Sequence, residues 1–204
     1  MEDVKNAEYP RFEVPIVDFV IMAAYRDEPR LNYDGKPTSR RTTSIHLAIR
    51  RRIRNAVIFE LFEIYDRFDV NYSDELGYTH FHAVCEIGLE NAVEKFLEFG
   101  QDPNVVATQT GDSTLHLALP YFNERIMEFL LRNGADPNLA NVEGLTPLHV
   151  ICQRRYNDDL AEMFLKMSDE KHQTVQVDAR DIRGLTPRRG VENPKLLLSE
   201  WWFL

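Results

Sequence analysis

Histidine and cysteine are the side chains of this sequence that could do chemistry, as metal ligands, general bases or nucleophiles. The two cysteines, Cys85 and Cys152, do not form a C-x-x-C pair, and His80 and His172 have no partners at metal-ligand spacing. The other four histidines lie 36, 34 and 33 residues apart, at His46, His82, His116 and His149. No Ser/His/Asp or Cys/His set can be assembled without these regularly spaced residues. The sequence therefore predicts no catalytic, metal-binding or cofactor-binding residue, and a non-enzyme.

A phosphate-binding loop is the other chemical motif to consider. Gly35-Lys36-Pro37-Thr38 is similar to the end of such a loop, but it lacks the earlier glycine and a preceding apolar strand. We therefore expect no nucleotide site.

The spacing of the four histidines belongs to an internal repeat. Each lies in a similar hexapeptide, TSIHLA (43–48), THFHAV (79–84), STLHLA (113–118) and TPLHVI (146–151). Asp-x-Asn triplets recur in the same register at 69–71, 102–104 and 136–138, and so do Gly77, Gly111, Gly144 and Gly184. A period of this length predicts a solenoid of stacked units.

Each unit is expected to contain two helices. The hydroxyl residue before the histidine motif would cap a short first helix, which Gly88, Asn123 and Asn157 would end in left-handed conformations. Second helices follow from Asn91, Glu124 and Asp158, with apolar residues at i, i+3 and i+4. Such a helix pair cannot bury its apolar stripes alone, so neighbouring units must stack into one core.

These units resemble ankyrin repeats, most fully in GYTHFHAVCEIG…FGQDPN and GDSTLHLALP…NGADPN. The resemblance implies an all-α ankyrin-repeat solenoid of helix-turn-helix units with hairpin fingers projecting at right angles. It also implies that the motif histidines make hydrogen bonds within and between repeats, and that the chain binds other proteins. Each cysteine lies three residues after a motif histidine, which favours a small buried side chain over a reactive thiol.

We expect three regions. Residues 1–33 form an N-terminal segment whose apolar helix, opening at Pro15, caps the first repeat. Residues 34–180 form four repeats, approximately 34–71, 72–104, 105–138 and 139–180. Residues 181–204 form a broken fifth repeat, in which Arg188 and Arg189 replace the expected Leu and His, and an apolar tail. The tail is either an improvised cap over the fourth repeat or the end of a truncated array.

The resemblance places partner contacts at the finger tips and on the exposed side of the first helices, which together form a concave groove. The finger positions that we expect to bind a partner are Glu75, Leu76, Tyr78, Gln109, Asp112, Glu143 and Leu145. The helix positions are Glu86, Ile87, Tyr121, Arg154 and Arg155. Aromatic and arginine side chains dominate interface energetics, although each position could also be an ordinary solvated one.

Composition limits the function classes. A net charge of −9 argues against a general nucleic-acid binder, although residues 36–54 carry seven basic and no acidic residues. We expect that basic segment to be the solvated end of the first repeat, with an import signal or acidic-partner patch as the alternative. The apolar run at 14–25 is too short to span a membrane, and the first residues do not resemble a signal peptide.

The sequence therefore predicts a monomeric, cytoplasmic or nuclear interaction module that binds a protein partner and needs no cofactor, nucleic acid or membrane. Two subtypes stay open, a substrate adaptor of a ubiquitin ligase and an inhibitor of a transcription factor. A truncated or degenerate array without a function of its own is the further alternative.

Overall fold

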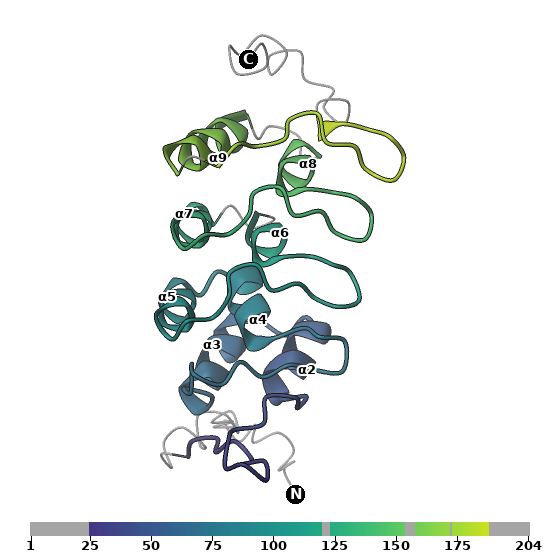
Figure 1. The fold of residues 1–204 in the computed structure, drawn as a ribbon. Helices are drawn as coiled ribbons and strands as arrows, with labels where there is room; N and C mark the ends of the chain where they lie inside the picture. Colours follow the sequence, from purple (N-terminus) through teal and green to yellow (C-terminus); the bar gives the residue numbers. More distant parts are fainter. Residues whose placement is uncertain (1–24, 120–122, 154–157, 172, 188–204) are drawn as a thin grey trace, which may run out of the picture.

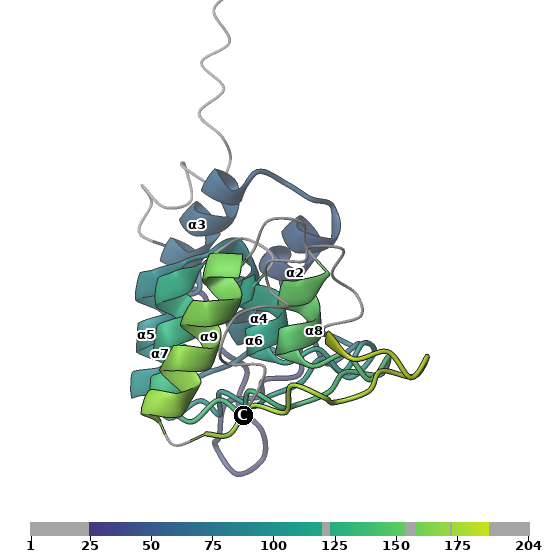
Figure 2. The same ribbon diagram turned by 90° about the horizontal axis from the view of Figure 1, so that it is seen from above.

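The computed structural model describes residues 25–119, 123–153, 158–171 and 173–187. In these residues the helices follow one another as four pairs (Figure 1): α2 (Ser44–Arg50) with α3 (Asn55–Ile64), α4 (His80–Ile87) with α5 (Glu90–Glu98), α6 (Thr114–Ala118) with α7 (Glu124–Arg132), and α8 (Pro147–Cys152) with α9 (Asp158–Glu170). The pairs stack in chain order, and the loops between them project away from the helices (Figure 2). The predicted all-α repeat solenoid is confirmed. The expected N-terminal capping helix and the apolar tail lie outside the described residues.

The first helix of each pair begins at the predicted hydroxyl residue. The Thr79 hydroxyl accepts a hydrogen bond from the His82 backbone N–H (3.1 Å), and Thr146 does the same for His149 (3.5 Å). The histidine ring reaches back in turn, because its Nδ1 accepts the backbone N–H of the capping residue in all four pairs, at 3.0–3.2 Å. This reciprocal capping satisfies two backbone donors that a helix start leaves free.

Gly88 ends α4 as predicted, with φ of 83°. A Cβ at this position would lie 2.8 Å from Oδ1 of Asn123, so glycine is required for space as well as for conformation. The prediction for Asn123 was wrong: its φ is −79° and it is the N-cap of α7. Asn157 lies outside the described residues. Arg52, with φ of 52°, is the non-glycine residue that adopts a left-handed conformation in the described part.

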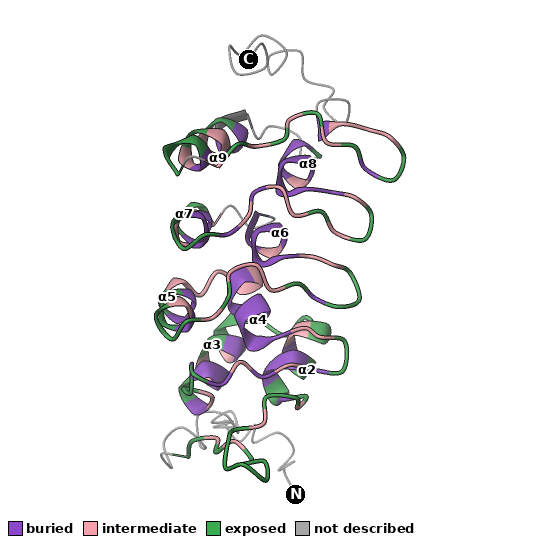
Figure 3. Ribbon diagram, in the orientation of Figure 1, coloured by how far each residue is buried: buried purple, intermediate pink, exposed green. Residues whose placement is uncertain are grey.

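The core lies between the two rows of helices and continues through all four pairs (Figure 3). Val93, Phe96 and Leu130, which the helical spacing assigned to the inner face, are at most 1% exposed. On α2 the core-facing residues are Ile45 and Ala48, at 0% and 7% exposure, whereas Leu47 is 44% exposed. Each pair therefore depends on its neighbours for burial of its apolar side chains.

A closed finger lies before each of α4, α6 and α8, and a fourth finger follows α9. The four fingers comprise residues 74–78, 107–112, 141–145 and 181–185. In each finger the first residue's N–H donates to the last residue's carbonyl at 2.9 Å. Neighbouring fingers are also linked, since Val142 N–H donates to the Thr110 carbonyl and Ile182 N–H to the Glu143 carbonyl, both at 3.0 Å. The last three fingers are therefore connected to one another by backbone hydrogen bonds.

A cluster of polar contacts holds the chain before the first repeat. Arg41 Nη2 lies 2.6 Å from both carboxylate oxygens of Asp27, and the Tyr72 hydroxyl donates to the same carboxylate at 2.6 Å. The Arg41 guanidinium also stacks on the Tyr72 ring, 4.5 Å from its centroid. This cluster fixes the Asp27 segment against the start of the array.

Candidate functional site

A pocket of about 280 Å³ lies where the 74–78 and 107–112 fingers meet the first helices. Five residues that the sequence predicted for partner binding line it: Leu76, Tyr78, Glu86, Gln109 and Asp112. The structure thus brings together side chains from two fingers and from α4. The other lining residues are His46, Ile49, Arg50, Asp74, Ala107, Thr110 and Leu117.

The remaining predicted residues lie elsewhere. Glu75 and Glu143 are exposed on their fingers, and Ile87 is half-buried against the core. Leu145 is buried at 8% exposure, so its side chain is not presented to a partner; its backbone carbonyl binds His116 instead. Tyr121, Arg154 and Arg155 lie outside the described residues.

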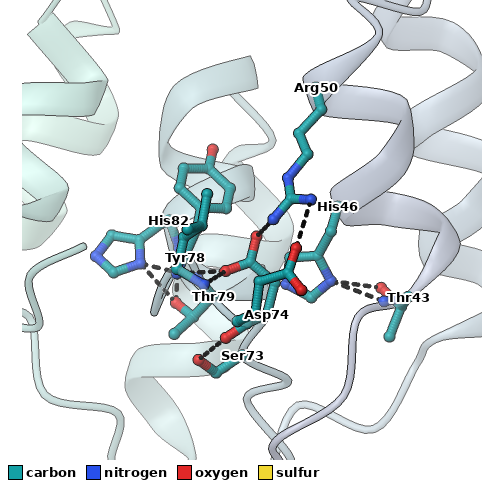
Figure 4. Close-up of polar contacts among 10 residues, drawn as sticks. Thr43, His46, Arg50, Ser73, Asp74, Tyr78, Thr79 and His82 are labelled. Carbon is teal, nitrogen blue, oxygen red and sulfur yellow. Dashed lines mark hydrogen bonds and ion pairs between the residues drawn. The ribbon is translucent and has the colours of Figure 1, made fainter. Parts of the chain in front are cut away.

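Arg50 is the charged pocket residue for which sequence reasoning predicted a different role. It belongs to the basic segment that we expected to be merely solvated, yet its guanidinium binds Asp74 (2.8 Å) and Glu75 (3.1 Å). Figure 4 shows Arg50 reaching from α2 to this finger. Arg50 lies four residues after His46, as Glu86 lies four after His82. The repeat register could therefore have placed Arg50 beside Glu86 on the groove.

Asp74 holds the shape of the 74–78 finger. Its Oδ1 accepts the backbone N–H groups of Leu76 (2.8 Å) and Tyr78 (3.0 Å), while Oδ2 accepts from Arg50. Because the Asp74 side chain is 2% exposed, its charge needs these donors. The same bonds recur at Asn141 and Asp181, each of which accepts the N–H groups two and four residues later. The fingers are thus pre-ordered before any partner binds.

Tyr78 is positioned by a contact with Glu86. The Tyr78 hydroxyl donates to Oε2 of Glu86, and its ring lies 5.4 Å from the His82 ring. Burial, followed by the Glu86 charge, raises the pKa of Tyr78 far above its usual value. The phenol therefore stays protonated and remains a hydrogen-bond donor to the carboxylate.

The motif histidines link one repeat to the next. Since Nδ1 accepts a backbone N–H, the proton of the neutral ring must be on Nε2. Nε2–H then donates to a carbonyl of the following unit: His82 to Val105 (3.1 Å), His116 to Leu145 (2.8 Å) and His149 to Leu185 (3.1 Å). The predicted bonds within and between repeats are confirmed for these three. Nε2 of His46 has no hydrogen-bond partner among the described residues.

The broken fifth repeat also accepts one of these hydrogen bonds between repeats, because its 181–185 finger supplies the carbonyl for His149. Its glycine, Gly184, adopts φ of 73° as the earlier finger glycines do. The finger is therefore complete even though Arg188 and Arg189, which lie outside the described residues, replace the next helix motif. It finishes the hydrogen bonding of the fourth repeat.

His80 and the cysteines are also accounted for by the fold. Nε2 of His80 lies 2.6 Å from the Thr43 hydroxyl, and burial lowers its pKa well below the usual value. Cys85 and Cys152 are both buried as predicted, and burial raises the pKa of Cys85. In the described ranges, no group of three or more His, Cys, Asp or Glu side chains could hold a metal ion.

In the part of the chain that the structure describes, no helix combines the length and the apolar character that crossing a bilayer requires.

Comparison with known proteins identifies the repeats. The family model for ankyrin repeats (3 copies) matches residues 45–141. BCL-6 corepressor-like protein 1 of Homo sapiens is 34% identical over 125 residues, which is 59% of this chain and 7% of that protein. The human ankyrin repeat and MYND domain-containing protein 1 is 34% identical over 100 residues, 46% of this chain and 10% of the relative.

A third relative, ankyrin repeat and SAM domain-containing protein 6 of Danio rerio, is 35% identical over 95 residues, 44% of this chain and 13% of that protein. This chain thus spans only a small part of the length of these relatives. The structure of this chain displays a repeat array with capping histidines, left-handed glycines and stacked helix pairs. Residues 45–141 of this chain are ankyrin repeats.

Proposed function

We propose that this chain is a non-catalytic intracellular module that holds a protein partner in the concave groove between its fingers and its first helices. Ankyrin repeats are protein–protein interaction modules. The observation that carries the proposal is the 280 Å³ pocket, which brings together five of the positions that the sequence predicted for partner binding. Variable side chains on a fixed framework are where a repeat protein acquires its specificity.

The groove has the properties of an interface that is ready before binding. Each of its fingers is closed by a backbone bond, and the 107–112 finger is also bonded to the next finger, so little conformational entropy is lost when a partner docks. Leu76 is 40% exposed beside Tyr78 and Leu117. Apolar and aromatic groups surrounded by polar side chains are typical of the energetically dominant part of an interface.

The experiment is partner capture in living cells by proximity labelling, followed by affinity measurement with purified proteins. Leu76→Lys places a charge in the apolar part of the pocket and leaves the backbone N–H that Asp74 binds. Phe99→Lys is the matched control, because Phe99 is 59% exposed at the end of α5, away from the fingers. We expect Leu76→Lys to weaken partner affinity at least tenfold and Phe99→Lys to leave it unchanged. Equal affinities for both variants would refute the groove as the binding surface.

A second candidate is an inhibitor of a transcription factor, one of the subtypes that the sequence left open. It is favoured by the similarity to a relative whose name describes it as corepressor-like. Tethering the chain to a reporter promoter tests it: reduced transcription that depends on Leu76 would support this candidate, and unchanged transcription would count against it.

A further inference from the structure

We propose that the 280 Å³ pocket takes a lysine or arginine side chain from an extended segment of the partner. This inference rests on the proposed function, since it names the chemistry that the same groove recognises. It is carried by the imbalance of charge around the pocket. Asp74, Glu86 and Asp112 line it together with one cation, Arg50, and Glu75 lies at its edge.

Arg50 already pairs with two carboxylates and cannot neutralise the others around the pocket. Its two terminal nitrogens bind Asp74 and Glu75, one carboxylate each. Within the described residues, Glu86 and Asp112 receive hydrogen bonds from neutral groups: Glu86 from the Tyr78 hydroxyl, and Asp112 from the Asn141 amide at 2.8 Å. Two carboxylates therefore face the pocket without a cationic partner in this part of the chain.

Both carboxylates are half-buried, and a charge in such a setting interacts more strongly with a ligand than one in bulk water. An incoming ammonium or guanidinium group would pair with Glu86 and Asp112 from opposite sides, one on α4 and the other on the 107–112 finger. An acidic peptide or a nucleic-acid phosphate would be repelled by the same groups. The electrostatics therefore select a cationic side chain.

The apolar lining matches the remainder of such a side chain. Ile49, Leu76, Tyr78 and Leu117 surround the pocket beside the charged groups. Lysine and arginine carry long methylene stems that pack on apolar surface while the charged end stays with its partners. The pocket thus offers both halves of the environment that a basic side chain requires.

The test uses a phage-displayed library of random peptides selected on the purified full chain. The decisive variant is the double substitution Glu86→Gln and Asp112→Asn. Each new amide keeps an oxygen that can accept the existing bond from Tyr78 or Asn141, so the charge changes while the hydrogen bonds are retained. Glu94→Gln with Glu98→Gln is the control, because it removes the same charge from the exposed face of α5. Circular dichroism melting confirms that each variant is folded.

We expect the enriched peptides to share a lysine or arginine. The pocket variant should weaken their binding at least tenfold, the control should leave it unchanged, and affinity should fall as salt rises. Some peptides could lose affinity with Leu76→Lys, and so bind through the groove, yet lack a basic residue or bind the pocket variant unchanged. Such peptides would overturn the inference and leave the proposed function standing. Peptides insensitive to every groove substitution, or a selection that enriches none, would overturn both.

Discussion

Replacing His82 by glutamine should remove about 2 kcal/mol of the pH dependence of folding stability between pH 7.5 and pH 5. His82 is fully buried, its Nδ1 accepts the Thr79 N–H, and its Nε2–H donates to the Val105 carbonyl. This arrangement fits the neutral ring, and burial lowers the pKa of His82 to about 4. The Val105 carbonyl and the charges of Asp112 and Asp74 oppose that shift in part.

The sign follows from the two pKa values. The unfolded chain has a histidine pKa of about 6.5, so it binds a proton at acidic pH that the folded chain rejects. The stability that His82 contributes is complete above pH 6.5 and is lost as the pH falls towards 4. With one pKa unit equal to about 1.4 kcal/mol, the loss between pH 7.5 and pH 5 is about 2 kcal/mol.

Glutamine is the suitable replacement because it can still accept the Thr79 N–H in a capping box, while it does not titrate. His46, His80 and His116 also have lowered pKa values, but they are present in both proteins and their effects cancel in the comparison. Urea unfolding followed by circular dichroism at several pH values gives both stabilities. A variant that loses as much stability as the natural chain on acidification would refute this account of His82.

Three further predictions concern the packing, the turns and the contact between Tyr72 and Asp27. Leu148→Ala should destabilise the chain by about 2–5 kcal/mol in urea unfolding, since Leu148 is 0% exposed; a loss below about 0.5 kcal/mol would contradict the stacking. Gly144→Ala should lower the melting temperature more than Gly184→Ala does. Both glycines have φ near 72°, where a side chain is strained by about 1–2 kcal/mol. Of the two added Cβ atoms, only the one at Gly144 would lie 3.0 Å from the Asp181 Cα. Equal melting temperatures would contradict this crowding. Tyr72→Phe removes the hydroxyl that binds Asp27 and should lower stability by about 1 kcal/mol, a loss that Asp27→Asn should reduce in a double-mutant cycle.

The period of the sequence was sufficient to predict the repeat framework. The histidine, glycine and capping hydroxyl each act within a few residues of their own position or at a fixed offset in the next unit, so one register predicts all of them. Gly88 was assigned correctly because glycine adopts a left-handed conformation freely. Asn123 was misassigned because asparagine serves at either end of a helix, and only the packing of its side chain against Gly88 decides between them.

The pocket was predicted in part. Its finger residues follow from the register, but the ion pairs of Arg50 with Asp74 and Glu75 join positions about 24 residues apart, and composition alone assigned Arg50 to a solvated patch. Leu145 was placed at the surface because it follows the finger glycine, as Tyr78 does. The larger Tyr78 reaches Glu86 at the groove, whereas Leu145 packs inward. Which way a side chain turns depends on neighbours that the repeat pattern does not specify.

Photo-crosslinking from single positions tests most directly whether the partner lies in the groove. A photoreactive phenylalanine analogue replaces Gln109, which is exposed on the 107–112 finger and lines the pocket, or Phe99 on the far end of α5. The account predicts a covalent adduct with the bound partner from position 109 and none from position 99. Adducts from position 99 alone, or equally from both, would contradict a partner bound in the concave groove.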